Sequence, residues 1–159
     1  MGGSMGFNAA EEGHVMMILT PADLGGTSTR TSAYINMEGY SKCQIFLGIG
    51  VSAGASTAIL YESSDGSGSA VTAIAATYYQ EVTASGDTLG ARTAMTSSGL
   101  TVANTSTTFY VIEKDADELT AEYPYLNLRL SALDSTTLTC AFAVLSGARY
   151  GSDQNPTAL

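Results

Sequence analysis

His14, the single histidine of the chain, is the first candidate for acid–base chemistry. A catalytic triad needs a base that a carboxylate orients and that points at a nucleophile. Ser and Thr occur throughout this sequence, so their presence does not mark a nucleophile. We therefore interpret His14 as an ordinary side chain at a strand edge, and we expect neither catalytic residues nor a cofactor.

The densest acidic cluster consists of Asp115, Asp117 and Glu118. A calcium loop alternates oxygen ligands and adds a glycine at its turn and a distal glutamate. The run Asp-Ala-Asp-Glu-Leu contains no glycine. It is typical of a solvated loop, with a structural cation site as the alternative, and we expect no metal.

The two cysteines, Cys43 and Cys140, both fall in predicted strands. Two cysteines and one histidine without a CxxC spacing make no zinc motif. Their simplest interpretation is a pair of buried thiols that act as small hydrophobic side chains. A disulfide between neighbouring strands is the alternative, which a reducing compartment disfavours.

Composition narrows the class of partner. The net charge is -9, from 15 acidic against 6 basic residues, and the basic residues do not cluster. Nucleic-acid binding requires clustered positive charge, so it is disfavoured. No apolar run reaches the roughly 20 residues of a membrane helix, and no signal peptide is visible. We expect synthesis in a cytoplasm.

The elements that must position these residues are short strands. Period-two patterns and turn residues predict them in the following ranges. The segments are 14–19, 32–37, 42–51, 56–63, 71–82, 107–113, 123–133 and 137–145, with a weak strand near 92–96. No long amphipathic helix interrupts them. The pattern predicts an all-β protein, an antiparallel β-sandwich or jelly-roll-like barrel of about 7–9 strands.

Side-chain alternation assigns the faces of three strands. In 42–51, Ile45, Leu47, Ile49 and Val51 share one face, and Gly48 and Gly50 leave room for close approach on the other. Leu126, Leu128 and Leu130 mark the core face of 123–133. In 137–145 we expect the larger residues to face the core and the small ones to face another layer. The larger set is Leu138, Cys140, Phe142 and Val144, and the small set is Thr139, Ala141 and Ala143.

The last two strands are joined by a short polar turn, so we expect an antiparallel hairpin at the centre of a sheet. Residues 1–31 are interpreted as an extended N-terminal arm with one strand, residues 32–150 as one domain and residues 151–159 as a tail. Residues 1–4 are consistent with a cloning remnant or a native start.

Three stretches carry a family resemblance. They are residues 37–46 (MEGYSKCQIF), residues 111–119 (VIEKDADEL) leading into 125–128 (YLNL), and residues 143–150 (AVLSGARY). In this order and spacing the chain resembles the small proteins encoded among tailed-phage head genes, the head decoration or cement proteins. Residues 83–106 match nothing in that family.

The resemblance implies a β-sandwich on the outer surface of an icosahedral capsid, with the major capsid protein as partner and no enzymatic activity. Such proteins often self-associate, for instance as homotrimers. We expect partner contacts at the N-terminal arm and at the chain exit, and the candidate residues are Phe7, His14, Met16, Ile18, Arg149 and Tyr150.

Two other classes remain open. One is a tail or head–tail connector β-sandwich, which differs from a decoration protein in its number of copies per particle. The other is a carbohydrate-binding or adhesin module. The absence of Trp and of a visible signal peptide counts against that class.

Overall fold

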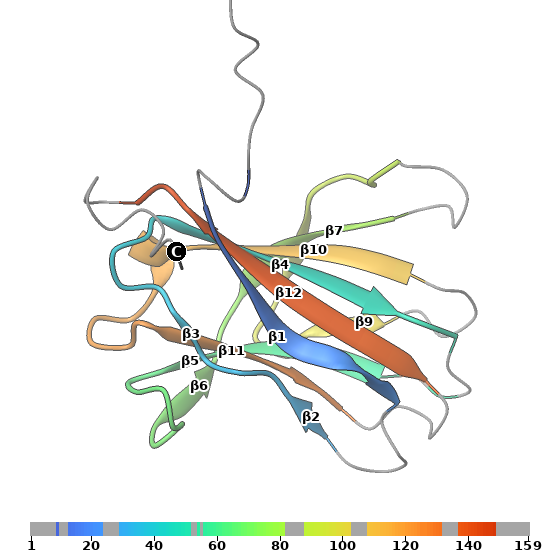
Figure 1. Ribbon diagram of the computed structural model, residues 1–159, viewed down its shortest axis with the longest axis horizontal. Coiled ribbons are helices and arrows are strands. Elements are labelled where there is room, and N and C mark those ends of the chain that lie inside the picture. Colours follow the sequence, from blue (N-terminus) through green and yellow to red (C-terminus); the bar gives the residue numbers. More distant parts are fainter. Residues whose placement is uncertain are drawn as a thin grey trace, which may run out of the picture.

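The fold consists of two antiparallel sheets of six strands each (Figure 1). The computed structural model describes residues 9, 13–23, 29–51, 54, 56–81, 88–102, 108–131 and 137–148. The predicted all-β sandwich is confirmed, and the sheets do not close into a barrel.

The first sheet has the strand order β1-β12-β4-β10-β7-β8. Its strands are β1 (Gly13–Asp23), β12 (Leu138–Ser146), β4 (Lys42–Ile49), β10 (Thr108–Asp115), β7 (Ala76–Gln80) and β8 (Thr93–Met95). Within the described ranges, the β1 edge pairs with β12 alone.

The second sheet has the order β2-β11-β5-β6, with β3 also on β11 and β9 on β5. Its strands are β2 (Arg30–Thr31), β11 (Tyr125–Leu130), β5 (Ser56–Ser63), β6 (Val71–Ala73), β3 (Ile35–Asn36) and β9 (Leu100–Val102). Several strands of two or three residues raise the number above the predicted 7–9. One 3-10 turn, η1 (Ala116–Glu118), follows β10.

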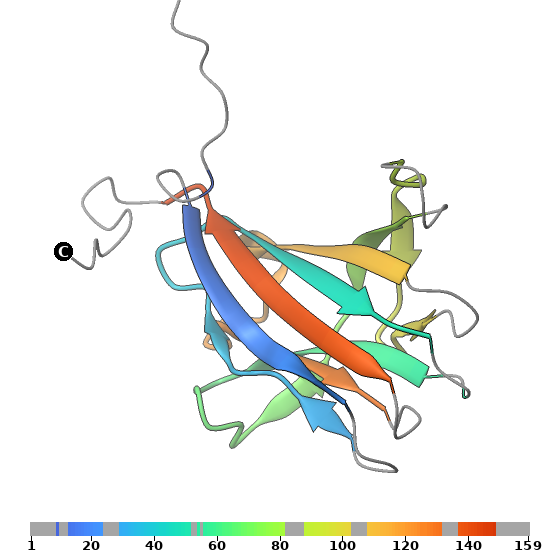
Figure 2. The same ribbon diagram turned by 45° about the vertical axis from the view of Figure 1, so that its right-hand side comes forward.

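The hydrophobic core lies between the two sheets (Figure 2). Ile45, Leu47 and Ile49 of β4 are at most 1% exposed, and the three leucines of β11 are fully buried. The sequence assignments are therefore confirmed for these residues of β4 and for the leucines of β11, whereas Val51 lies beyond the end of β4 and is 59% exposed. Gly48 correspondingly lies on the outer face of β4.

The predicted facing of β12 is wrong. Ala141, Ala143 and Leu145 point into the core, whereas Leu138 is 64% and Phe142 is 36% exposed on the outer face. The register explains the inversion, because Ala143 pairs with Ile45 and Ala141 with Leu47. Directly paired residues share a face, so the inward isoleucines and leucine of β4 carry the alanines of β12 inward with them.

The predicted hairpin between the last two strands is also wrong. β11 pairs with β2, β3 and β5 in the second sheet, whereas β12 pairs with β1 and β4 in the first. The two strands therefore belong to different sheets. The leucines of β11 therefore meet β12 across the core and not along a ladder.

Residues 13–23, assigned to the N-terminal arm in the sequence, form the edge strand β1. Pro21 lies within this strand, at a sheet edge where a missing N–H is tolerated. Arg30 of β2 donates from Nη1 to the carbonyl oxygen of Ala22 at 3.2 Å and to Oγ1 of Thr139 at 2.8 Å. Its Nη2 donates to the carbonyl oxygen of Thr20. Arg30 thus ties the second sheet to β1 and β12.

The face assignments of β11 and β12 lead to two matched predictions. Leu128→Asp places a carboxylate in the core and loses roughly 1.5–3 kcal/mol of burial before the cost of desolvating the charge. Against a total stability of about 5–15 kcal/mol, we expect no soluble folded protein. Leu138→Asp is the matched control on the outer face, and we expect it to melt cooperatively near the wild-type temperature.

Circular dichroism and thermal melting of the soluble fractions measure both variants. A folded Leu128→Asp protein, or an unfolded Leu138→Asp protein, would contradict the two face assignments.

Candidate functional site

The outer face of the first sheet carries large apolar side chains that the fold does not bury. Met17 is 57% and Val15 is 48% exposed on β1, next to the exposed residues of β12. Cross-strand pairing makes the group continuous, because Met17 pairs with Phe142 and Phe142 pairs with Phe46. We call this surface the phenylalanine face, and its members are Val15, Met17, Phe46, Gly48, Phe109, Leu138, Cys140 and Phe142.

The three phenylalanines form one aromatic group on that face. The rings of Phe46 and Phe142 stack with centroids 4.8 Å apart and planes 6° apart, and Phe109 lies 6.1 Å from Phe46. Such pairs stabilise by about 0.5–1.5 kcal/mol beyond their buried area. The stacking holds the rings in a fixed arrangement, so the face is a preformed apolar surface.

Gly48 is the one member of this face that has no side chain. Gly48 pairs with Cys140 on one side and with Phe109 on the other. A Cβ atom at this position would meet only Cys140, with Sγ at 3.4 Å and the carbonyl oxygen at 4.0 Å. The chain's own packing therefore has room for a side chain that glycine does not supply.

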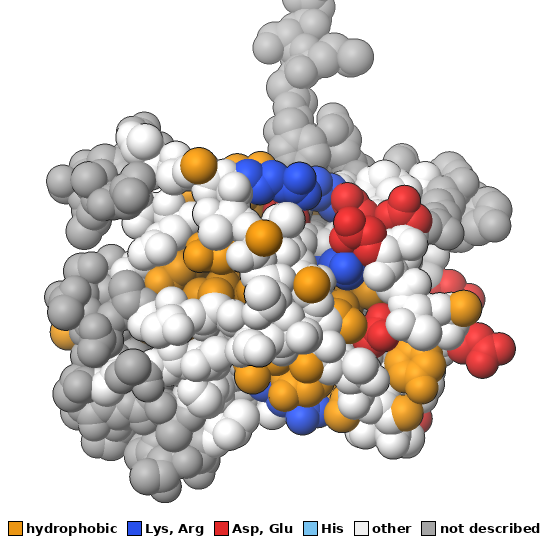
Figure 3. All heavy atoms as spheres, turned by 180° about the vertical axis from the view of Figure 1, so that it is seen from behind, with side chains coloured by type: hydrophobic (Ala, Val, Ile, Leu, Met, Phe, Trp, Pro, Cys, Tyr) orange, Lys and Arg blue, Asp and Glu red, His pale blue; other side chains and the backbone are white. Residues whose placement is uncertain are grey.

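Charged residues lie where the face ends, along the first residues of β4 and the last of β10. Glu113 accepts a hydrogen bond from Gln44 Nε2 at 2.7 Å, and its carboxylate lies 3.4 Å from Lys42 Nζ and 3.9 Å from Arg92 Nε. Figure 3, seen from behind, shows basic and acidic side chains adjacent along the upper part of the molecule. These charges are matched within the chain.

A recess of about 260 Å³ opens at the end of the sandwich where β1 begins and β12 ends. It is lined by His14, Met16, Tyr34, Asn36, Glu38, Tyr40 and Leu145. The rings of His14 and Tyr40 are 6.2 Å apart. The structure thus brings together His14 and Met16, two of the residues predicted from the sequence to contact a partner.

Ile18, another predicted contact residue, does not line this recess. Ile18 is only 4% exposed and packs into the core, so its side chain offers almost no surface to a partner. Phe7, Arg149 and Tyr150 lie outside the described residues. Sequence reasoning missed Tyr34, which falls within the predicted strand 32–37, and Tyr40, which falls between that strand and the next.

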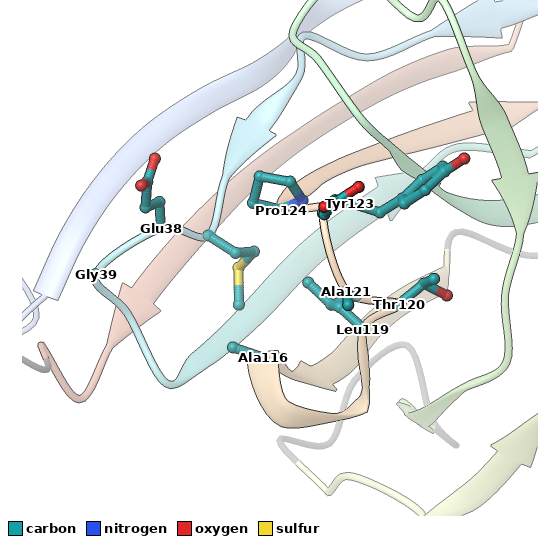
Figure 4. A pocket seen from close by; sticks show the side chains of 10 residues that line it. Glu38, Gly39, Ala116, Leu119, Thr120, Ala121, Tyr123 and Pro124 are labelled. Atoms are coloured by element: carbon teal, nitrogen blue, oxygen red, sulfur yellow. The ribbon is translucent and has the colours of Figure 1, made fainter.

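A second cavity, of about 380 Å³, lies on the other side of the Glu38–Gly39 turn (Figure 4). Figure 4 shows Leu119, Thr120 and Ala121 on one side of it and Glu38 and Gly39 on the other. Buried Glu62 anchors its loop by accepting hydrogen bonds from the backbone N–H and the hydroxyl of Thr120, at 2.9 and 2.5 Å. This carboxylate has a structural role that its sequence context did not reveal.

Two of the three acidic residues considered for metal binding form ion pairs within the chain. Glu118 pairs with Lys114 at 3.0 Å, and Asp115 lies 3.9 Å from Lys42. Within the described ranges, no group of three His, Cys, Asp or Glu side chains is arranged to hold a metal ion. No helix in the same ranges has both the length and the apolar character that crossing a bilayer requires.

Asp65 forms a turn with its carboxylate. Its carboxylate accepts hydrogen bonds from the hydroxyl of Ser67 and from the backbone N–H groups of Ser67, Gly68 and Ser69. Hydrogen bonds from Ser69, and then from Ser67, lower the pKa of this carboxyl well below its ordinary value, because they favour the ionised form. Asp65 therefore organises the turn between β5 and β6.

The two cysteines are free and lie on opposite faces of the first sheet. Cys43 points into the core at 1% exposure, whereas Cys140 is partly exposed on the phenylalanine face. Residues on opposite faces of one sheet direct their Cβ atoms apart, so these thiols cannot form a disulfide without rearrangement.

Burial raises the pKa of Cys43 from its ordinary 9.0 to about 12. The unfolded chain ionises near 9, so the contribution of this thiol to stability is complete below pH 9 and is lost as the pH rises towards 12. We expect the free energy of unfolding to fall by up to about 1.4 kcal/mol per pH unit from this group. Cys43→Ala should be less stable at pH 7 but should decline less steeply between pH 9 and 11.

Denaturant titrations at several pH values measure this difference. Identical slopes for Cys43→Ala and wild type would show that Cys43 is not buried as a thiol. Cys140→Ala is the matched control and should keep the steep decline.

Comparison with known proteins adds little beyond the fold. No family model matches this chain, and no curated protein matches it. Among solved structures, the SPBc2 prophage-derived protein YomS is similar, with a TM-score of 0.47 and 15% sequence identity. The alignment covers 85% of this chain and 94% of YomS. Similarity at this level does not carry function.

Proposed function

We propose that this protein is a structural virion protein that binds the outer surface of a tailed-phage capsid and stabilises the shell. The observation that carries the proposal is the phenylalanine face. A sandwich buries its core between its sheets, so its fold requires no large apolar residues on an outer face. The outer face nevertheless carries Met17, Leu138 and three phenylalanines, and burying them against another protein is favourable.

The energetics favour an assembled state. Burial of apolar surface stabilises by about 25 cal/mol per Å², and contiguous exposed apolar patches mark interaction sites. The aromatic group of Phe46, Phe109 and Phe142 resembles the anchors that dominate protein interfaces. A protein that is a permanent part of a large assembly keeps such a surface buried against its neighbours.

The family resemblance supports a phage head as that assembly. A shell under internal DNA pressure gains strength from a clamp that buries additional interface across subunit seams. Repeated attachment sums modest contacts into tight binding. The charge of -9 favours an exterior location over contact with DNA, and it keeps particles mutually repulsive.

The end recess is a second part of the proposed shell contact, beside the phenylalanine face. His14, Tyr34 and Tyr40 combine aromatic surface with polar tips, a mixture enriched at interfaces. The same recess is what would favour the carbohydrate-binding alternative, since Asn36 and Glu38 add hydrogen-bonding groups to the rings. A tail or connector role would use the phenylalanine face equally well, in far fewer copies per particle.

Co-sedimentation of the purified protein with capsid shells that lack their minor proteins tests the proposal. We expect saturable binding at hundreds of copies per shell, as repeated icosahedral sites require. His14→Ala should weaken binding several-fold because it removes one wall of the recess. Val51→Ser is the control, since Val51 is 59% exposed but does not line the recess.

Absence of binding by the wild-type protein would contradict the decoration role. Binding that saturates at a single ring of about a dozen copies would favour the connector alternative. Equal binding by His14→Ala and Val51→Ser would remove the recess from the interface.

A further inference from the structure

We propose that the cavity between the Glu38–Gly39 turn and the segment 119–124 binds an arginine side chain of a partner protein. We call it the loop cavity. Its volume of about 380 Å³ lies near the lower end of the range for ligand sites, so it suits one long side chain. The proposed shell contact uses the phenylalanine face and the end recess, so the loop cavity is a site additional to it.

Part of the lining of the loop cavity is apolar. Met37 is 2% exposed, and Ala116 and Leu119 pack against the hydrophobic core from the 3-10 turn η1 and the residue after it. Pro124 adds further apolar surface (Figure 4). A long basic side chain lays its methylene stem along such a surface and keeps its charged head near water. The apolar lining therefore matches the stem of the proposed ligand.

The rim of the loop cavity is acidic. Glu38 and Glu122 both line it, and both are exposed. Within the described residues, neither carboxylate forms an ion pair. None of the described lining residues is basic. An apolar wall beside two unpaired carboxylates is complementary to a side chain that combines an apolar stem with a cationic head.

A third carboxylate adds to the negative potential. Glu62 is 3% exposed and accepts two hydrogen bonds from Thr120, which itself lines the loop cavity. These donors are neutral, and Glu62 forms no ion pair with any residue that the structure describes. Solvent screens a buried charge less than an exposed one, so its field reaches further. A cation bound beside Thr120 would offset this field.

Hydrogen bonds hold the walls of the loop cavity in place before a partner binds. The N–H of Met37 donates to the carbonyl oxygen of Pro124 at 2.8 Å, and the N–H of Tyr123 donates to that of Thr120 at 3.0 Å. Glu122 has a φ of +70°, a left-handed conformation that is uncommon for glutamate. Such conformations persist where the surrounding structure fixes them, and they cluster at binding sites. A wall that is already ordered reduces the entropy lost on binding.

Arginine suits this cavity better than lysine. The guanidinium group has five N–H donors in a fixed plane, so it can donate to carboxylates on two different segments at once. It is also more weakly hydrated than an ammonium group and loses less on leaving water. Arginine is, in addition, enriched among the residues that contribute most to binding at protein interfaces.

An NMR titration of the isotope-labelled protein with the blocked tripeptide Ala-Arg-Ala, without shells, tests this inference. The backbone amide signals of Gly39 and of residues 120–123 should shift saturably, with a Kd of about 1 mM for a single side chain. The corresponding lysine peptide should bind about threefold more weakly and the norleucine peptide about tenfold more weakly. Binding of the arginine peptide should weaken as the ionic strength rises, because both rim carboxylates are exposed.

Four variants separate binding from folding. Glu38→Gln and Glu122→Gln each remove one charge and keep the side-chain shape, and each should weaken binding of the arginine peptide several-fold. Glu122→Gly relieves the left-handed conformation, so it should melt at or above the wild-type temperature and still lose affinity. Asp117→Asn is the matched control, since Asp117 is exposed on η1 but does not line the loop cavity, and it should bind like wild type.

Absence of a saturable shift at the cavity amides would overturn the site. Equal affinities for the arginine and norleucine peptides would overturn the role of the carboxylates, as would an equal loss in Asp117→Asn and the two glutamine variants. Equal affinity for the lysine peptide would overturn the assignment to arginine. Because the titration contains no shells, a failure of shell binding would refute the proposed function and leave this inference standing.

Discussion

The inward alternation of β4 is the constraint on which the rest of the structure depends. Ile45, Leu47 and Ile49 must face the second sheet, and β4 pairs along its length with both β10 and β12. A shift of one residue in either ladder would turn a whole strand over. The register therefore places Ala141 and Ala143 in the core and leaves the phenylalanines outside, although burying the larger side chains would gain more apolar area.

This constraint gives the molecule two different outer surfaces. On the second sheet, Arg129 lies 4.3 Å above the ring of Tyr61 and donates to Asn127, so its outer side chains bind one another. On the first sheet, stacked rings and an open glycine position meet solvent. This asymmetry supports the proposal that the first sheet is the side that contacts a partner.

The sequence was sufficient for the fold class and for the faces of β4 and β11, because their alternation is strict. It misled at β12, where side-chain size suggested one facing and the pairing with β4 imposes the other. The outward facing of Gly48 was predicted from the alternation of β4, and the outward facing of Phe46 follows from the same pattern. Tyr34 and Tyr40 could not, because long-range pairing of short strands brings them to His14. The contacts of Arg30 with the first sheet could not be predicted either, because Arg30 and Thr139 lie 109 residues apart in the sequence.

The central claim is that the phenylalanine face is covered when the protein assembles, and oxidation of Met17 measures this most directly. Met17 is 57% exposed in the single chain and accessible to peroxide. Mass spectrometry should show fast oxidation of Met17 in the free protein and several-fold slower oxidation in the shell-bound protein. Equal oxidation rates in the free and shell-bound states would contradict the account.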